Sequence, residues 1–236
     1  MTMQTATRRT PTAAILAASL LSWTACHTPT VTPAQRHAAE TRWAEDLQRF
    51  AAEDAAHPPR PGCTLFVGSS SFRLWHNLSE AFPDRCTLNR GFGGSQMHDL
   101  LALADRLVWP YAPREIVVYE GDNDIAAGKS PDQFYAEFRA FLREVHRRLP
   151  HARVYFVSIK PSPARESFWP MAQQANQKVR ALADSDPRLC YIDVATPMLD
   201  AHGRPRPELF GPDRLHLNPT GYALWAEIIR QALNHP

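Results

Sequence analysis

The sequence predicts an α/β fold in which helices cover both faces of a parallel sheet. From residue 64 to the end of the chain, short apolar runs alternate with longer helical patterns. Continuous apolar strands separated by helices are typical of a sheet that is buried on both sides. The 236 residues, of which 44% are hydrophobic and 21% charged, suit one domain of ordinary size. We therefore expect a three-layer α/β/α sandwich of about five strands.

The expected elements follow one another in a regular order. The strand candidates are rich in β-branched residues or flanked by proline and glycine, and they cover 64–68, 86–89, 115–119, 152–159 and 188–194. The helical patterns cover 96–107, 131–149, 168–183 and 218–233. In the second of these, Phe134, Phe138, Phe141 and Val145 share one face. A further amphipathic helix is expected over 35–56, before a proline-rich segment ends it.

The first 25 residues have the composition of an export signal. Arg8 and Arg9 are followed by a short apolar run over 13–21 and then by small residues. This run is too short to span a bilayer. Either ordinary signal peptidase cleaves near Thr24 or Ala25, or lipoprotein processing makes Cys26 the lipid-bearing N-terminus. The sequence WTAC, which resembles a bacterial lipobox, favours the second interpretation.

These observations divide the chain into a signal peptide (1–25), a tether (26–34) and one folded domain (35–236). We expect an exported bacterial protein that is periplasmic, or a lipoprotein anchored to a membrane through Cys26. The sequence has 26 Lys and Arg residues and 24 Asp and Glu residues, and removal of the signal peptide leaves 24 of each sign. No global basic field remains to hold nucleic acid, so no nucleic-acid partner is expected.

Polar residues follow the expected strands at the points where ligands bind in such sheets. Serines follow the first strand (GSSS, 68–71), glycines the second (GFGGS, 91–95) and an amide the third (EGDND, 120–124), while DRLHLN (213–218) precedes the last helix. Taken singly, such features are usually a helix cap, a turn or a surface histidine. Together they supply the nucleophile, base, carboxylate and oxyanion donors that acyl transfer requires.

These blocks resemble those of the SGNH family, also called GDSL esterases and lipases, which contribute Ser, Gly, Asn and His in this chain order. The resemblance covers nearly all of the chain from Cys63 onward and implies a flavodoxin-like fold. One departure is clear, because the usual Gly-Asp-Ser reads Gly68-Ser69-Ser70 here. Register against the family places the nucleophile at Ser70 and leaves Ser69 where the aspartate normally stands.

The resemblance implies a carboxylic ester hydrolase acting on short acyl or acetyl esters through an acyl-enzyme. His216 would be the general base and Asp213 would orient it. The oxyanion would be met by the backbone N–H groups of Ser70 and Gly94 and by the side chain of Asn123. No cofactor or metal is expected, since the sequence has no phosphate-loop motif, no His-Glu-X-X-His and no Cys-X-X-Cys.

Other functions and the substrate stay open. The same Ser70 could serve a transferase that acetylates a cell-envelope sugar, or the chain could be a non-catalytic carbohydrate-binding lipoprotein. The expected partner is a small-molecule or acetylated-carbohydrate ester, with a possible lipid anchor at Cys26. The long loop 160–170, rich in proline and aromatic residues, either walls the substrate pocket or is a rigid surface loop.

The strand order of the family also bears on the cysteines. It makes the first two strands parallel neighbours, and Cys63 and Cys86 each stand five residues before the glycine that ends their strand. We therefore predict a disulfide between them, at the edge opposite the active site. The alternative is that both are small core residues. Cys190 is expected to be a buried free thiol.

Overall fold

The computed structural model describes residue 1 and residues 31–234 of the chain. The expected signal peptide, the lipidation site at Cys26 and most of the tether lie outside the described residues. Within the part that the structure describes, none of the helices combines the length and the apolar character that a membrane span requires.

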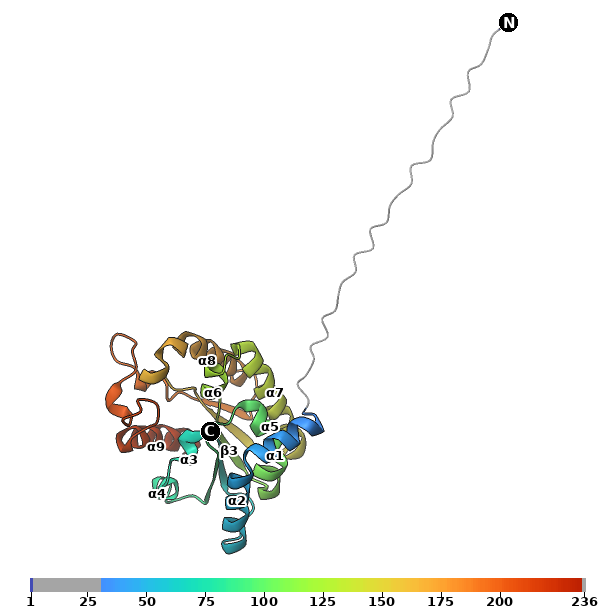
Figure 1. Ribbon diagram of the computed structural model, residues 1–236. Helices are drawn as coiled ribbons and strands as arrows, with labels where there is room; N and C mark the ends of the chain where they lie inside the picture. The colour runs from blue at the N-terminus through green and yellow to red at the C-terminus, as the bar shows by residue number, and fades with distance from the viewer. Residues whose placement is uncertain (2–30, 235–236) are drawn as a thin grey trace.

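Five parallel strands form one sheet at the centre of the fold (Figure 1). They are β1 (Thr64–Gly68), β2 (Thr87–Gly91), β3 (Glu115–Tyr119), β4 (Arg153–Val157) and β5 (Leu189–Ile192). Their order across the sheet is β2-β1-β3-β4-β5, and every neighbouring pair is parallel. The predicted α/β sandwich with a five-stranded parallel sheet is therefore confirmed.

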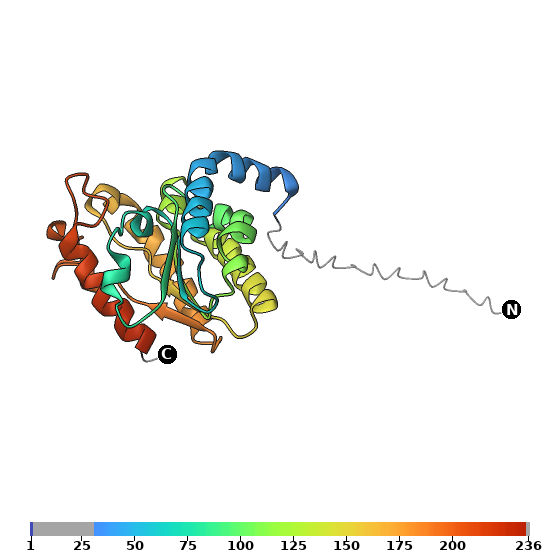
Figure 2. The same ribbon diagram turned by 90° about the horizontal axis from the view of Figure 1, so that it is seen from below.

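Helices cover the two faces of this sheet (Figures 1 and 2). One face carries α1 (Pro33–Arg42), α2 (Ala44–Ala56), α5 (Met97–Leu107), α7 (Pro131–Arg148) and α8 (Trp169–Ala183), and the other carries α4 (Leu78–Ala81) and α9 (Pro219–Asn234). Two short helices, α3 (Ser70–Arg73) and α6 (Asp122–Ala126), follow β1 and β3. Short 3₁₀ segments cover Trp109–Tyr111, Pro163–Phe168, Thr196–Met198 and Pro207–Leu209. Because strand side chains alternate, Leu65 and Val67 pack into the first layer and Phe66 into the second.

The helix expected over 35–56 is in fact two helices that meet at Trp43, so this expectation was wrong. Trp43 has non-helical backbone angles (φ −110°, ψ 28°) and is buried. Its indole N–H donates to the carbonyl of Gly93 at 3.2 Å, and its ring packs edge-on against Phe92 with 5.4 Å between centroids. The helical break lets Trp43 reach the glycine-rich turn, and tertiary contact thus overrides the helical pattern.

The second strand continues two residues past the apolar run 86–89 and ends at Gly91, which pairs with Gly68. The side chain of Arg90, which follows the apolar run, is buried within the strand. Asp54 and Glu53 of α2 form ion pairs with Arg90, and Tyr111 accepts from its Nε at 2.9 Å. A buried charge is tolerated at this position because helix α2 provides its partners.

Cys63 and Cys86 form a disulfide at the amino ends of β1 and β2, with 4.9 Å between their Cα atoms. This pairing was predicted and is confirmed. Cys190 of β5 is a free thiol, although it is half-buried rather than fully buried.

Candidate active site

The three consecutive serines after β1 have different environments. The chain turns sharply at Gly68 (φ 133°), where a Cβ atom would overlap the backbone of Tyr119. Ser69 is the N-cap residue of the short helix α3, and its side chain is buried, as is that of Ser71. Ser70 lies between them and is partly exposed. Of the three serines, Ser70, the expected nucleophile, is therefore the one that solvent and a substrate can reach.

His216 links Ser70 to Asp213. Its Nε2 lies 3.0 Å from Ser70 Oγ, and its Nδ1 lies 2.5 Å from Asp213 Oδ2. A proton on Nδ1 is favoured by the carboxylate, which leaves the Nε2 lone pair free to accept from the serine hydroxyl. The structure thus brings together the three residues that the sequence resemblance selected.

Asp213 can reach the histidine because the chain folds back between them. Arg214 adopts the left-handed conformation (φ 58°), and Asp213 Oδ1 accepts the N–H groups of Leu215 and His216, both at 3.0 Å. The bond from Leu215 foremost, and the bonds to His216, lower the pKa of Asp213 to about 2 against the opposing effect of burial. The carboxylate therefore stays ionised at any pH at which an esterase is usually assayed.

The expected oxyanion donors on the backbone are available. Within the described part of the chain, neither the N–H of Ser70 nor that of Gly94 is paired with an acceptor. Gly94 is exposed and has φ 78°, and a Cβ atom there would meet nothing within 4 Å. Glycine is thus required at this position by its backbone conformation, and not by a close approach of other protein atoms.

Asn123, the expected third donor, lies in the first turn of α6. Its side chain contacts the serine segment 68–71 and the glycine-rich segment 91–95. Its Nδ2 donates to Ser69 Oγ at 2.7 Å and to the carbonyl of Ser95 at 2.9 Å. Both amide hydrogens are thereby engaged. A substrate oxyanion could receive one of them only in exchange for one of these two bonds. In the free protein Ser69, at the position of the family's aspartate, helps to hold the amide.

A buried ion cluster behind Asn123 was missed by the sequence analysis. Asp122 lies 2.6 Å from the ammonium of Lys160 and 2.8 Å from the guanidinium of Arg165. Burial alone would raise the pKa of Asp122, but the two cations outweigh it and lower that pKa. The cluster has one carboxylate for two cations, and Arg165 also donates to Asn123 Oδ1 at 3.0 Å. Lys160 directly after the fourth strand was the only signal in the sequence.

The loop 160–170 that carries Arg165 is tied to the site. The N–H of Ala164 donates to the carbonyl of Arg214 at 3.0 Å, which joins the loop to the segment that carries His216. The cavity between this loop and Asp122 measures only about 10 Å³, too small for any group of a substrate. The loop therefore supports the site without enclosing a pocket at this point.

Two buried acids, Glu120 and Asp124, accept hydrogen bonds from residues that follow the glycine-rich turn. Ser95 donates from Oγ to Glu120 Oε1 at 2.6 Å, and the N–H of Met97 donates to Asp124 at 3.0 Å. Burial first, and then the neighbouring charge of Asp124, raise the pKa of Glu120 well above its usual value. Glu120 therefore holds its proton more tightly than an exposed glutamate does.

Three possible metal ligands lie close together beside this group: His98, Asp124 and Glu137. The ammonium of Lys129 lies between them, at 2.8 Å from His98 Nδ1, 2.9 Å from Asp124 and 2.6 Å from Glu137. A bound lysine thus takes the position that a cation would need, and we assign no metal to this cluster.

The chain was compared with known proteins. Its sequence matches the GDSL-like Lipase/Acylhydrolase family over residues 61–224. No protein among the curated sequences matches it. Among solved structures, a candidate platelet activating factor from Streptococcus pneumonia has 21% identity and a TM-score of 0.72, over 86% of this chain and 100% of that chain.

Two further solved structures are similar. A GDSL-like lipase from Bacteroides thetaiotaomicron has 20% identity and a TM-score of 0.70, over 80% of this chain and 97% of the other. A variant of an acetyl-xylooligosaccharide esterase from Geobacillus has 14% identity and a TM-score of 0.61, over 74% of this chain and 95% of the other. At such low identity these likenesses show a shared fold.

Proposed function

The chain belongs to the GDSL-like lipase/acylhydrolase family of carboxylic ester hydrolases, and from that premise we propose that it cleaves short acyl or acetyl esters through an acyl-enzyme on Ser70. The observation that carries the proposal is the hydrogen-bonded series of the side chains of Ser70, His216 and Asp213. The distances of 3.0 Å and 2.5 Å along this series are those of a nucleophile bonded to a base and of a base bonded to its orienting carboxylate.

The reaction would proceed in two steps. Ser70 Oγ attacks the carbonyl carbon while its proton passes to His216 Nε2, and the carbonyl oxygen becomes an oxyanion. The C–O bond to the alcohol then breaks, and His216 returns the proton to the departing oxygen. Water, activated by the same histidine, hydrolyses the acyl-serine and releases the acid.

The oxyanion would be stabilised by the free N–H groups of Ser70 and Gly94 and by the amide of Asn123. Loss of one such donor typically raises the barrier by ~3 to 4 kcal/mol. The amide is oriented by Ser69, Ser95 and Arg165 and would exchange only one of its two donated bonds when the oxyanion forms. An oriented donor of this kind needs little reorganisation during the reaction.

Hydrolysis of p-nitrophenyl acetate and butyrate by the purified domain tests the proposal. We expect Ser70→Ala to abolish the activity and the neighbouring Ser71→Ala, which removes a buried hydroxyl, to leave most of it. Ser69→Ala should also retain most of the activity, because it leaves the other partners of Asn123 in place. Full activity in Ser70→Ala would overturn the assignment. Product analysis with an added sugar acceptor would reveal a transferase instead.

We also propose that the protein is exported and acts in the periplasm or on a lipid anchor at Cys26. The signal-like sequence over 1–25 supports this location, and so does the Cys63–Cys86 disulfide, since disulfides persist mainly in oxidising compartments. The mass of the mature N-terminus isolated from the producing cell tests the proposal. An unprocessed Met1 in the major species would contradict it.

A further inference from the structure

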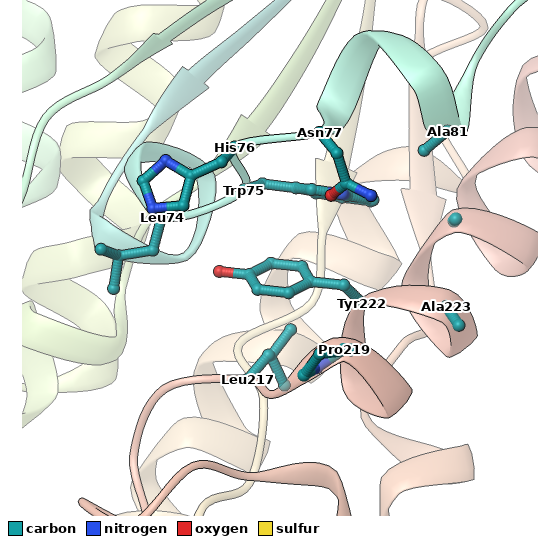
Figure 3. A pocket seen from close by; sticks show the side chains of 10 residues that line it. Leu74, Trp75, His76, Asn77, Ala81, Leu217, Pro219, Tyr222 and Ala223 are labelled. Carbon is teal, nitrogen blue, oxygen red and sulfur yellow. The ribbon is translucent and has the colours of Figure 1, made fainter.

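A pocket of about 490 Å³ lies between the turn 74–77 and the beginning of α9 (Figure 3). No residue of the proposed catalytic and oxyanion groups lines it, so we give this pocket no part in the reaction. A buried acid, Glu120, is by contrast connected to the oxyanion site through Ser95, and the proposed reaction gives it no role.

Glu120 joins the two segments that supply the expected oxyanion donors Gly94 and Asn123. It directly follows β3, and its Oε1 accepts from Ser95 Oγ at 2.6 Å. Ser95 is the residue after Gly94, and its carbonyl accepts from Nδ2 of Asn123 at 2.9 Å. Because Ser95 and Glu120 are both fully buried, water cannot replace the bond between them. A single hydrogen bond to Glu120 therefore helps to fix both donors.

The surroundings of Glu120 favour the neutral carboxylic acid. Its Oε2 is buried and has no hydrogen-bond partner within the part of the chain that the structure describes. The charged and titratable groups that act on Glu120, or that contact one of those groups, are Asp99 and His98 of α5, Asp124 of α6, Lys129, and Glu137 of α7. The ammonium of Lys129 lies 2.9 Å from Asp124 and 2.6 Å from Glu137, so two other carboxylates already balance its charge.

The resulting balance of effects is one-sided. Burial first, and then the charge of Asp124, raise the pKa of Glu120 against the opposing effects of the bond from Ser95 and of Lys129. The neutral acid can accept the bond from Ser95 without placing a charge in this region.

We propose that Glu120 is a positioning residue for ester cleavage, which acts through Ser95 on the oxyanion site. The inference rests on the proposed function and adds to it a residue that touches neither the substrate nor the reacting atoms. The neutral form is the active one. A carboxylate at this position would add a negative charge, shielded from solvent, behind the place where the oxyanion forms, and would raise the barrier.

Steady-state kinetics with p-nitrophenyl acetate test the positioning role. Glu120→Met removes the acceptor of the bond from Ser95, and we expect it to lower kcat about tenfold and to leave KM nearly unchanged, because the donors matter mainly once the oxyanion forms. Glu120→Gln keeps an acceptor oxygen and should recover most of the loss. An unchanged kcat in Glu120→Met, or a rise in KM at constant kcat, would overturn the inference.

A double-mutant cycle tests whether Glu120 acts through Ser95. Ser95→Ala removes the hydroxyl and keeps the carbonyl that binds Asn123, and it should lower kcat as well. Adding Glu120→Met to Ser95→Ala should then lower kcat by less than a further factor of about two, because both changes remove the same bond. Losses that multiply would show that the two residues act independently and would overturn the inference.

The pH profile is a readout that a purely structural role would not change. We expect the ratio of kcat for Glu120→Gln to kcat for the wild type to rise from pH 6 to pH 9, because only the wild type can become charged at this position. The matched control is Glu115→Gln at the opposite end of β3, where Glu115 accepts from Thr64 Oγ1 at 2.6 Å. Its ratio should stay constant. A constant ratio for Glu120→Gln would overturn the requirement for the neutral acid.

The wild type separates this inference from the proposed function. Hydrolysis that Ser70→Ala abolishes, together with an unchanged kcat in Glu120→Met, would overturn the role of Glu120 alone. No hydrolysis of any ester by the wild type would overturn the esterase proposal, and with it the positioning role.

Discussion

The guanidinium of Arg165 donates a hydrogen bond to the side-chain oxygen of Asn123, with 3.0 Å between Nη2 and Oδ1. The same guanidinium lies 2.8 Å from the buried carboxylate of Asp122, which holds it in place. A cation on the amide oxygen draws electron density from the amide and strengthens its N–H groups as donors. Arg165 therefore acts on the proposed oxyanion site through Asn123.

We predict that Arg165→Met lowers kcat for p-nitrophenyl acetate about tenfold and leaves KM nearly unchanged, since the amide matters mainly once the oxyanion forms. Arg165→Lys should recover part of the loss because it keeps a positive charge beside Asp122. Arg204→Met, which removes an exposed arginine remote from the site, is the control. Steady-state kinetics that show a rise in KM at constant kcat would assign Arg165 to substrate binding instead.

The acid side of the pH–activity profile should report a single proton. The pKa of Asp213 is held at about 2, so this carboxylate remains ionised between pH 4 and pH 9. In the proposed mechanism His216 is the general base, and it must be neutral to accept the proton of Ser70. We predict that kcat/KM falls on the acid side with a slope of one in a logarithmic plot. A slope of two, measured with chemistry rate-limiting, would require a second essential group.

The sequence was a good guide to elements whose pattern is local. The apolar runs of β1 and β3 are long enough and clean enough to predict both strands at their observed bounds. Trp43 and Arg90 could not be placed in this way. The break at Trp43 depends on Gly93, and the burial of Arg90 depends on acids of α2, in both cases partners more than thirty residues away in the sequence.

The candidate site shows the same difference between features that depend on local sequence and features that depend on distant residues. Ser70, Asn123, Asp213 and His216 follow strands or lie in one short loop, where residue type and chain order were enough to select them. The role of Arg165 could not be predicted, because it depends on how loop 160–170 folds over α6. That Ser69 occupies the amide of Asn123 could not be foreseen either, since the two residues meet only in the folded sheet.

The stability of the fold should fall as Glu120 ionises. In the unfolded chain Glu120 loses its proton near the usual value of 4.5, whereas burial keeps the proton bound to a much higher pH in the folded state. Between these two pH values the folded protein binds one proton more, so its free energy of unfolding decreases as the pH rises. Gln cannot ionise and keeps an oxygen that can accept from Ser95.

We therefore predict that Glu120→Gln raises the Tm relative to the wild type, and that the difference grows from pH 5 to pH 9. Differential scanning calorimetry at several pH values measures it. Glu45→Gln, at an exposed position of α2, should give a small difference that does not depend on pH. A constant difference for Glu120→Gln over this range would mean that Glu120 is already ionised at pH 5.

The Cys63–Cys86 disulfide should stabilise the domain without affecting catalysis. It joins the amino ends of β1 and β2, whereas Ser70 lies beyond the carboxyl end of β1, about 16 Å away along the strand. Closing a loop with a sequence separation of 23 reduces the entropy of the unfolded chain, so Cys63→Ala/Cys86→Ala should lower the free energy of unfolding by about 3 kcal/mol. Urea denaturation measures this loss, and kcat/KM at 25 °C should not change.

Cys190→Ala, which removes the free thiol of β5, is the control and should have a much smaller effect. Equal stability of the double variant and the wild type would contradict the prediction, and so would thiol labelling of Cys63 or Cys86 in the unreduced, denatured protein.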